Sequence, residues 1–144
     1  MKYKTEIEIN KPIQSVISLF DNADNMGKWM EGLQSFEHLS GTAGQVGAKS
    51  KLVFQMGKRK VEMIETILTR NLPEEFSGTY ELDGIYNIIK NRFVKISENK
   101  TKYITENEFQ FKGFMKFIAF LLPGIFKKQS LKHLEAFKKF AESQ

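Results

Sequence analysis

The dipeptide Asp83-Gly84 constrains the fold of this chain more than any other feature of its sequence. It joins two strand-like segments, residues 75–82 and 85–96, and Asp-Gly in that setting is typical of a two-residue β-hairpin turn with positive φ at both central residues. Such a turn fixes the register, because a slip by one residue would move every side chain to the other face. The pairs expected on one face are Leu82–Ile85, Tyr80–Asn87, Gly78–Ile89 and Phe76–Asn91.

A second hairpin is expected to follow, with a turn over residues 97–101 and a strand over residues 102–112. Pairing Lys95 with Tyr103 places Arg92 opposite Glu106, and also Asn91 opposite Asn107. The first hairpin places the same arginine opposite Glu75, so the two registers build a ladder of opposite charges on what we interpret as the solvent face. The other face needs an apolar cover, because it carries Phe76, Tyr80, Ile89, Phe93, Phe109 and Phe111.

Residues 125–142 supply that cover. Their apolar side chains recur at helical spacing while lysines occupy the other positions, which predicts a long amphipathic helix. The apolar stripe is expected to consist of Phe126, Leu131, Leu134, Phe137 and Ala141.

The first half of the chain predicts the remaining elements. Residues 2–9 alternate between apolar and charged, as in a half-buried strand, and Pro12 then opens a short helix. We expect further elements in the order of a short helix over residues 24–31 and strands over residues 33–39, 51–56 and 59–70. The chain is therefore predicted to be α+β, with a curved antiparallel sheet of about seven strands.

Composition excludes several classes of site. The 144 residues are the size of one domain, so residues 1–144 are expected to form a single domain. The absence of Cys excludes disulfides, thiolate zinc sites and a cysteine nucleophile. The net charge of +5 is spread along the chain, which indicates a solvated surface and no nucleic-acid partner. The N-terminal residues lack the apolar run of a signal peptide, so we expect a cytoplasmic location.

The order of these elements resembles the START-like (SRPBCC) helix-grip superfamily, and in it the polyketide cyclase/dehydrase-like branch. The resemblance covers nearly the whole chain and rests on Pro12 at the first helix, Trp29 in the second, Val46-Gly47 before the third strand and Leu72-Pro73 after the fourth. It implies a cavity between the concave side of the sheet and the long helix, used in different members for lipids, hormones, quinones or polyketide intermediates. Many members are not enzymes, so the fold alone does not decide activity.

Three asparagines, Asn87, Asn91 and Asn107, are predicted to point inward beside Phe109 and Phe111. Asparagine is a poor strand former and costs about 1 to 3 kcal/mol when buried without a partner. Either Asn91 pairs with Asn107 or with a bound water, or the three amides orient the polar group of a ligand.

Glu65 is the candidate for a buried acid. A two-residue turn at Gly57-Lys58 would place it on the face of Phe54 and Val61, whereas a bulge in its strand would turn it outward. Burial would raise its pKa and suit it to general acid or base chemistry.

We read His38 and His133 as surface residues. The sequence shows no metal-ligand spacing and no cofactor motif, so neither a metal nor a cofactor is expected.

Residues 114–126 form the longest apolar run, which is too short to span a bilayer. We interpret it as a gate with Pro123-Gly124 as its joint, as an apolar docking surface, or as a place of transient membrane contact aided by Lys116, Lys127 and Lys128. The sequence carries no signal for an oligomeric state.

The leading hypothesis is binding or transport of a small hydrophobic, lipid-like or polyketide-like molecule rather than catalysis. The alternatives are a cyclase or dehydratase that uses Glu65, and a protein-interaction module. Trp29 is interpreted as core or as part of the pocket mouth. The residues expected to line the ligand site are Trp29, Phe54, Tyr80, Asn87, Asn91, Asn107, Phe109, Phe111, Phe126, Leu134 and Phe137.

Overall fold

One antiparallel sheet of seven strands forms the body of the molecule, in the order β1-β7-β6-β5-β4-β3-β2. The computed structural model describes residues 1–122 and 124–144. Its strands are β1 (Lys2–Ile9), β2 (Leu33–Ser40), β3 (Lys49–Met56), β4 (Arg59–Asn71), β5 (Glu75–Leu82), β6 (Ile85–Ser97) and β7 (Lys100–Phe111). Its helices are α1 (Ile13–Phe20), the 3-10 turn η1 (Ala23–Asn25), α2 (Met26–Trp29), α3 (Phe114–Leu121) and α4 (Gly124–Glu142).

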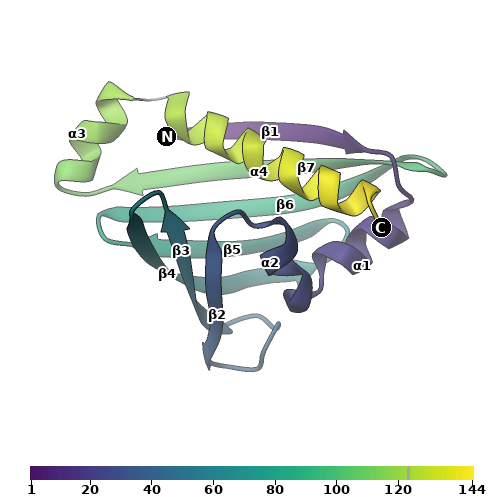
Figure 1. The fold of residues 1–144 in the computed structure, drawn as a ribbon, viewed down its shortest axis with the longest axis horizontal. Coiled ribbons are helices and arrows are strands. Elements are labelled where there is room, and N and C mark those ends of the chain that lie inside the picture. The colour runs from purple at the N-terminus through teal and green to yellow at the C-terminus, as the bar shows by residue number, and fades with distance from the viewer. Residues whose placement is uncertain (123) are drawn as a thin grey trace.

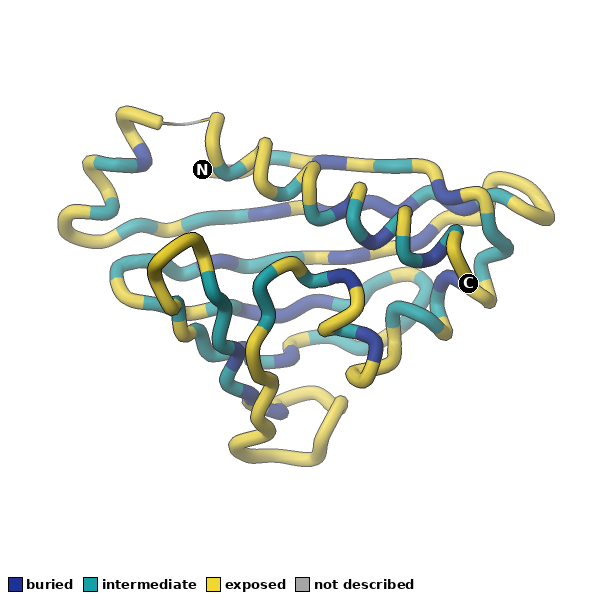
Figure 2. The backbone as a smooth tube through the Cα atoms, in the orientation of Figure 1, coloured by how far each residue is buried: buried dark blue, intermediate teal, exposed yellow. Residues whose placement is uncertain are grey.

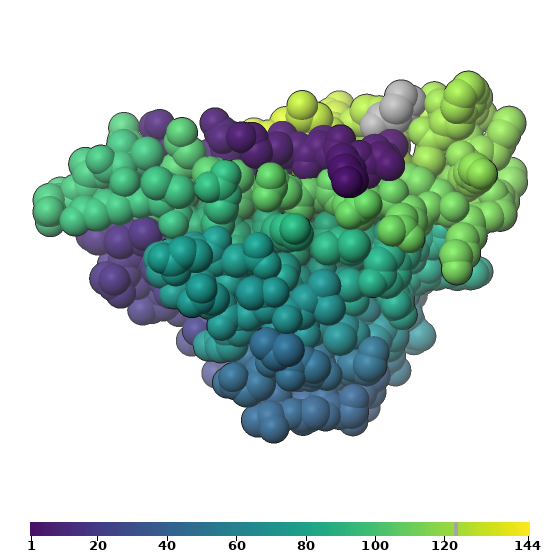
Figure 3. Space-filling view, turned by 180° about the vertical axis from the view of Figure 1, so that it is seen from behind, coloured from purple at the N-terminus to yellow at the C-terminus, as the bar shows by residue number. Residues whose placement is uncertain are grey.

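The arrangement confirms the predicted α+β helix-grip architecture. Figure 1 shows α4 lying across the concave side of the sheet, with α1 and α2 near its C-terminal end and α3 at the opposite end. Seen from behind, strands β5 to β7 make up much of the surface and no helix crosses them (Figure 3). Among the described residues, no helix is both long and apolar enough to cross a membrane.

The register of the β5–β6 hairpin is confirmed. Leu82 pairs with Ile85, and the four predicted pairs all form. The turn differs from the expected type, because Gly84 has a φ of 77° while, in the described part of the chain, no residue other than glycine has a positive φ. Asp83 therefore keeps an ordinary φ, and Gly84 alone supplies the unusual backbone conformation.

The predicted register of the β6–β7 hairpin is wrong by two residues. Phe93, not Lys95, pairs with Tyr103, and a β-bulge lies between Lys95 and Ser97. Because the shift is even, every side chain stays on its predicted face. The predicted charge ladder does not form, since Arg92 lies opposite Ile104. The charged row that does form on this face consists of Lys90, Glu106 and Lys4.

The C-terminal half of α4 seals one end of the concave face. Leu134, Phe137 and Ala141 are 1%, 0% and 0% exposed. They join a core with residues of β1, α1, α2, β6 and β7, namely Ile9, Val16, Trp29, Phe93 and Tyr103. The prediction for Leu131 is wrong: it is 38% exposed, because Ser130, four residues before Leu134, takes the place in the stripe.

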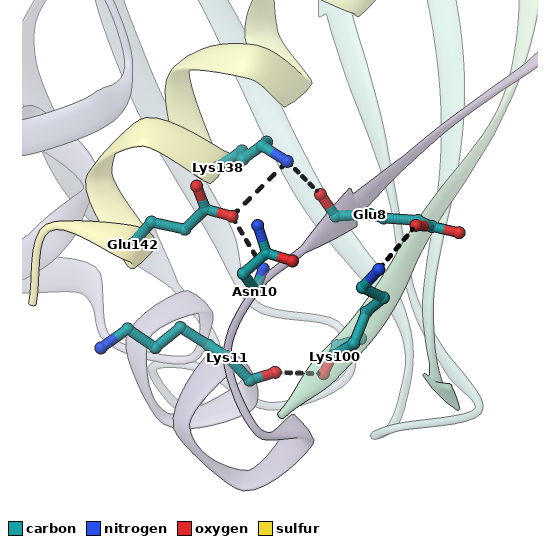
Figure 4. Close-up of polar contacts among 7 residues, drawn as sticks. Glu8, Asn10, Lys11, Lys100, Lys138 and Glu142 are labelled. Carbon is teal, nitrogen blue, oxygen red and sulfur yellow. Dashed lines mark hydrogen bonds and ion pairs between the residues drawn. The ribbon is translucent and has the colours of Figure 1, made fainter. Parts of the chain in front are cut away.

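Polar contacts hold both ends of α4 against β1. At the C-terminal end, Lys138 Nζ donates to the Glu8 carbonyl at 2.6 Å, and the Glu142 carboxylate accepts from the Asn10 backbone N–H at 2.7 Å (Figure 4). At the other end, the Tyr3 hydroxyl donates to the Phe126 carbonyl at 3.0 Å. The position of the helix over the sheet is therefore fixed along its length.

Replacing Gly84 with Ala should destabilise the protein. An alanine would have to adopt the φ of 77°, and its Cβ would lie 2.9 Å from Met115 Cγ. A positive φ costs about 1–2 kcal/mol in an L residue, and we expect at least that loss in the free energy of unfolding measured with urea. Gly27→Ala is the matched control, since its φ is not in the positive range and nothing lies within 4 Å of the added Cβ. Equal stabilities for the two variants would contradict this role of the turn.

Candidate functional site

The concave face has a sealed end and an open end. Toward the sealed end, Phe93 and Tyr103 are 3% and 1% exposed. Toward the α3 end, apolar side chains on the same face are only half-buried. Figure 2 shows the same contrast, with fully buried positions on the C-terminal half of α4 and mainly exposed ones on α3. The half-buried set is Phe54, Val61, Met63, Leu82, Ile85, Ile89, Phe109, Phe111 and Phe126.

A row of four polar side chains crosses the inner face between these apolar residues. The strand registers place Ser50 of β3 beside Glu65 of β4, Glu65 beside Tyr80 of β5, and Tyr80 beside Asn87 of β6. Ser50, Glu65 and Asn87 are 5%, 7% and 6% exposed, and Tyr80 is half-buried. We call Ser50, Glu65, Tyr80 and Asn87 the polar row; Phe109 of β7 continues it at the far side.

Glu65 points inward, which answers the question that its sequence left open. The β-bulge of its strand lies between Ile67 and Thr69, beyond Glu65, so the alternation from Phe54 and Val61 is preserved. The Tyr80 hydroxyl donates to Glu65 Oε2 at 2.7 Å. Among the described residues, no lysine, arginine or histidine forms an ion pair with this carboxyl.

The electrostatics of this pair follow from burial. Desolvation raises the pKa of Glu65, and the hydrogen bond from Tyr80 offsets part of that effect. Desolvation also raises the pKa of Tyr80 well above its ordinary value, and the nearby carboxylate raises it further. The pair is thus a proton donor and acceptor held in a poorly solvated place, which is what acid–base chemistry or the binding of one polar ligand group requires.

The asparagines are inward, and the Asn91–Asn107 pairing, one of the alternatives considered, does not form. Asn91 accepts from the Tyr103 hydroxyl at 2.8 Å and donates to the Phe76 carbonyl at 3.2 Å, so its amide is already satisfied within the protein. Asn107 instead accepts from Asn87 Nδ2 at 3.4 Å, a long contact. Among the described residues, Asn107 Nδ2 makes no hydrogen bond, so it is the inner amide group best placed to meet a ligand.

Three aromatic rings gather where β7 meets the first turn of α4. Ring centroids of Phe109 and Phe126 lie 4.9 Å apart, and those of Phe111 and Phe126 lie 5.2 Å apart. Beyond them, an open groove of about 550 Å³ runs beside α3. It is lined by Met1, Phe111, Gly113, Lys116, Phe117, Ala119 and Phe120. This groove lies at the open end, and the sequence indicated it only through the apolar run of residues 114–126.

Three of the predicted lining residues belong to the core instead. Trp29, Leu134 and Phe137 are 5%, 1% and 0% exposed, and the Trp29 and Phe137 rings lie 4.9 Å apart in an edge-to-face arrangement. Trp29 Nε1 is buried without a hydrogen-bond partner among the described residues. These side chains fill the sealed end and leave no surface there for a ligand.

The two histidines differ. His38 is exposed, as predicted, whereas the prediction for His133 is wrong because it is half-buried with its ring 4.7 Å from Trp29. Desolvation there lowers the pKa of His133 to about 4. Within residues 1–122 and 124–144, no group of three or more His, Asp or Glu side chains could hold a metal ion. Of the expected joint, Pro123 lies outside the described residues.

Comparisons with known proteins identify the architecture. No protein-family model matches the sequence, and no curated protein matches it significantly. Solved structures do match. The Zhui aromatase/cyclase from Streptomyces sp. R1128 has a TM-score of 0.81 at 10% identity, over 99% of this chain and 93% of that chain. A conserved protein from Geobacillus kaustophilus has a TM-score of 0.80 at 17% identity, over 99% and 96%.

A third match is norcoclaurine synthase from Thalictrum flavum, in complex with dopamine and hydroxybenzaldehyde. Its TM-score is 0.76 at 16% identity, over 100% of this chain and 87% of that chain. Identities this low show the fold and not the activity. The chain therefore has the START-like helix-grip fold that its sequence predicted.

Proposed function

We propose that this protein binds a small, mostly apolar molecule on the open end of the concave face, between the sheet and the start of α4. The observation that carries the proposal is the incomplete burial of an apolar face: Ile85, Ile89 and Phe109 point toward the concave side yet remain half-buried. Burying apolar surface contributes about 25 cal/mol per Å², so a hydrophobic ligand gains free energy by covering these side chains.

The polar row and Asn107 define what else the ligand would carry. An apolar site with a few polar groups is the usual form of a small-molecule pocket. Asn107 Nδ2 would donate to a ligand oxygen, while Glu65 would accept from a ligand hydroxyl or amine. The ligand is thus expected to be a hydrophobic body, lipid-like or polyketide-like, with one or two hydrogen-bonding groups.

The structural neighbours support this proposal. The norcoclaurine synthase structure holds dopamine and hydroxybenzaldehyde, both small aromatic molecules, in the same fold. The Zhui protein is an aromatase/cyclase, which accords with the resemblance of this chain to the polyketide cyclase-like branch. The norcoclaurine synthase complex is thus an example of this fold holding small aromatic molecules. The residues proposed to do so here are those of the open end.

A second candidate function is catalysis of the cyclase or dehydratase type, favoured by the Glu65–Tyr80 contact. A carboxyl whose pKa is raised by burial keeps its proton to a higher pH than an exposed one, and it can pass that proton to a carbonyl or hydroxyl of a bound substrate. Tyr80, which already donates to Glu65, would keep that carboxyl in position. Binding remains the leading proposal because it needs only the apolar face.

Filling the open end should weaken binding. Ile89→Trp adds bulk on the inner face between Gly78 and Asn107, and we expect it to reduce the affinity for the fluorescent probe 1-anilinonaphthalene-8-sulfonate by at least about tenfold, since it occupies the space of the probe. Ile88→Trp, one residue away on the opposite face, is the matched control and should bind the probe as the unaltered protein does. Equal affinities for the two variants would contradict the location of the site.

The protonation of Glu65 should be visible in stability. Because the folded state raises the pKa of Glu65 above its ordinary value of 4.5, it binds the proton more tightly than the unfolded chain does. Stability conferred by the neutral carboxyl is thus present at low pH and is lost as the pH rises from about 4.5 through the raised pKa.

Glu65→Gln should remove this dependence, so that its stability relative to the unaltered protein increases from pH 4.5 upward and then levels off. Glu62→Gln, on the exposed face of the same strand, should show no such trend. The measurement is urea unfolding of the three proteins across pH 4 to 8. Parallel curves for all three would show that Glu65 is an ordinary ionised carboxylate and would remove the basis for its role as an acid.

A further inference from the structure

The helix α3 exposes an aromatic face that none of the described residues covers. Phe114, Phe117 and Phe120 are 73%, 58% and 83% exposed, and Leu121 is 53% exposed. The rings of Phe114 and Phe117 lie 6.3 Å apart, as expected for residues one turn apart. Beyond the helix, Leu122 and Ile125 are 49% and 54% exposed, so the apolar surface continues to the start of α4.

The opposite side of α3 is anchored to the protein. Ala119 is 7% exposed, and Met115 packs against Gly84, where an added Cβ would lie 2.9 Å from Met115 Cγ. The helix sequence FMKFIAFL contains one polar residue, Lys116. A helix that is apolar on nearly all sides cannot bury both faces against one end of the sheet, so its outer face remains in water unless a partner covers it.

Exposed lysines flank this aromatic face along the chain. The exposed lysines of residues 109–134 are Lys112, Lys116, Lys127, Lys128 and Lys132, and this stretch contains no Asp or Glu. One acid, the exposed Asp83, lies in the turn against which Met115 packs. The surface thus combines exposed aromatic rings with a local excess of cations.

We propose that α3 and the start of α4 dock on an anionic lipid bilayer. Phenylalanine and leucine side chains would enter the boundary between headgroups and acyl chains, and the lysines would meet the lipid phosphates and carboxylates. A second copy of this chain fits less well, because a symmetric contact would bring the lysines of both copies together. The charge around the apolar face is complementary to anionic lipid and not to itself.

Docking in this way would place the 550 Å³ groove beside α3 at the bilayer surface. An apolar molecule could then pass between the membrane and the open end of the concave face with little exposure to water. This inference stands apart from the proposed ligand binding, since the protein could bind lipid surfaces whether or not it carries a ligand.

The test is flotation of the full-length protein with vesicles of phosphatidylcholine alone or with 30% phosphatidylserine. We expect flotation only with the anionic vesicles, because each lysine near such a surface adds to the free energy of binding. The variant Lys127→Gln/Lys128→Gln should reduce partitioning by at least about tenfold by the same reasoning, and Phe117→Ser/Phe120→Ser should abolish it.

Matched controls carry the same changes elsewhere: Lys58→Gln/Lys60→Gln on the β3–β4 hairpin and Phe36→Ser on β2, all at exposed positions. The controls should float like the unaltered protein, and near-equal thermal unfolding of all variants would show that each is folded. Absence of flotation with anionic vesicles, or an equal effect of the control variants, would overturn the proposal. A dimer in size-exclusion chromatography that Phe117→Ser/Phe120→Ser dissolves, without vesicle binding, would overturn it in favour of a second copy.

Discussion

The structure depends on the burial of one helix against a sheet that is too wide for it. Phe137 and Leu134 of α4 are almost completely removed from water, and they pack on rings from α1, α2 and β7. A helix with its side chains is about 10–12 Å in diameter. Seven strands spaced by about 4.8 Å span about 29 Å, so α4 covers only part of the concave face wherever it crosses.

The two short helices α1 and α2 determine which part of the concave face stays open. α1 and α2 add Val16, Phe20 and Trp29 beside the C-terminal half of α4 and complete the core there. The N-terminal half of α4 contributes Phe126 and Ser130, both half-buried, and receives no such support. The half-buried apolar face and the polar row therefore follow from how the helices are distributed, and the proposed ligand site is the part of the concave face that the core leaves only partly covered.

Much of the fold could be predicted from two features of the sequence, the hydrophobic periodicity of its segments and the Asp83-Gly84 turn. Asp83-Gly84 set the β5–β6 register, and the alternation of each strand set its inner face. The β6–β7 register could not be predicted, because the bulge between Lys95 and Ser97 has no clear signal in the sequence. The predicted inner face of each strand was still correct, because a register error of two residues leaves every side chain on the same face. The predicted charge ladder and the Asn91–Asn107 pair did not form.

The candidate site was predictable only as a set of inward residues. Tyr80 was expected to point inward, whereas the orientation of Glu65 was left open. Their contact depends on the β4–β5 register, which a second bulge after Ile67 interrupts. The core position of Trp29 and the partial burial of His133 depend on the packing of α2 against α4, and sequence spacing does not encode that contact. Local sequence patterns thus predicted the helices and strands and the face of each strand that points inward. The contacts between elements distant in the sequence could be seen only in the structure.

The central claim is that the concave face is sealed at one end and can receive an apolar molecule at the other. A titration of the methyl-labelled protein with naphthalene, followed by methyl NMR, tests it most directly. The account predicts saturable shifts for the methyl groups of Ile85 and Ile89 and none for those of Ile9, Val16 and Leu134. Shifts confined to the second group, or none in either, would contradict it.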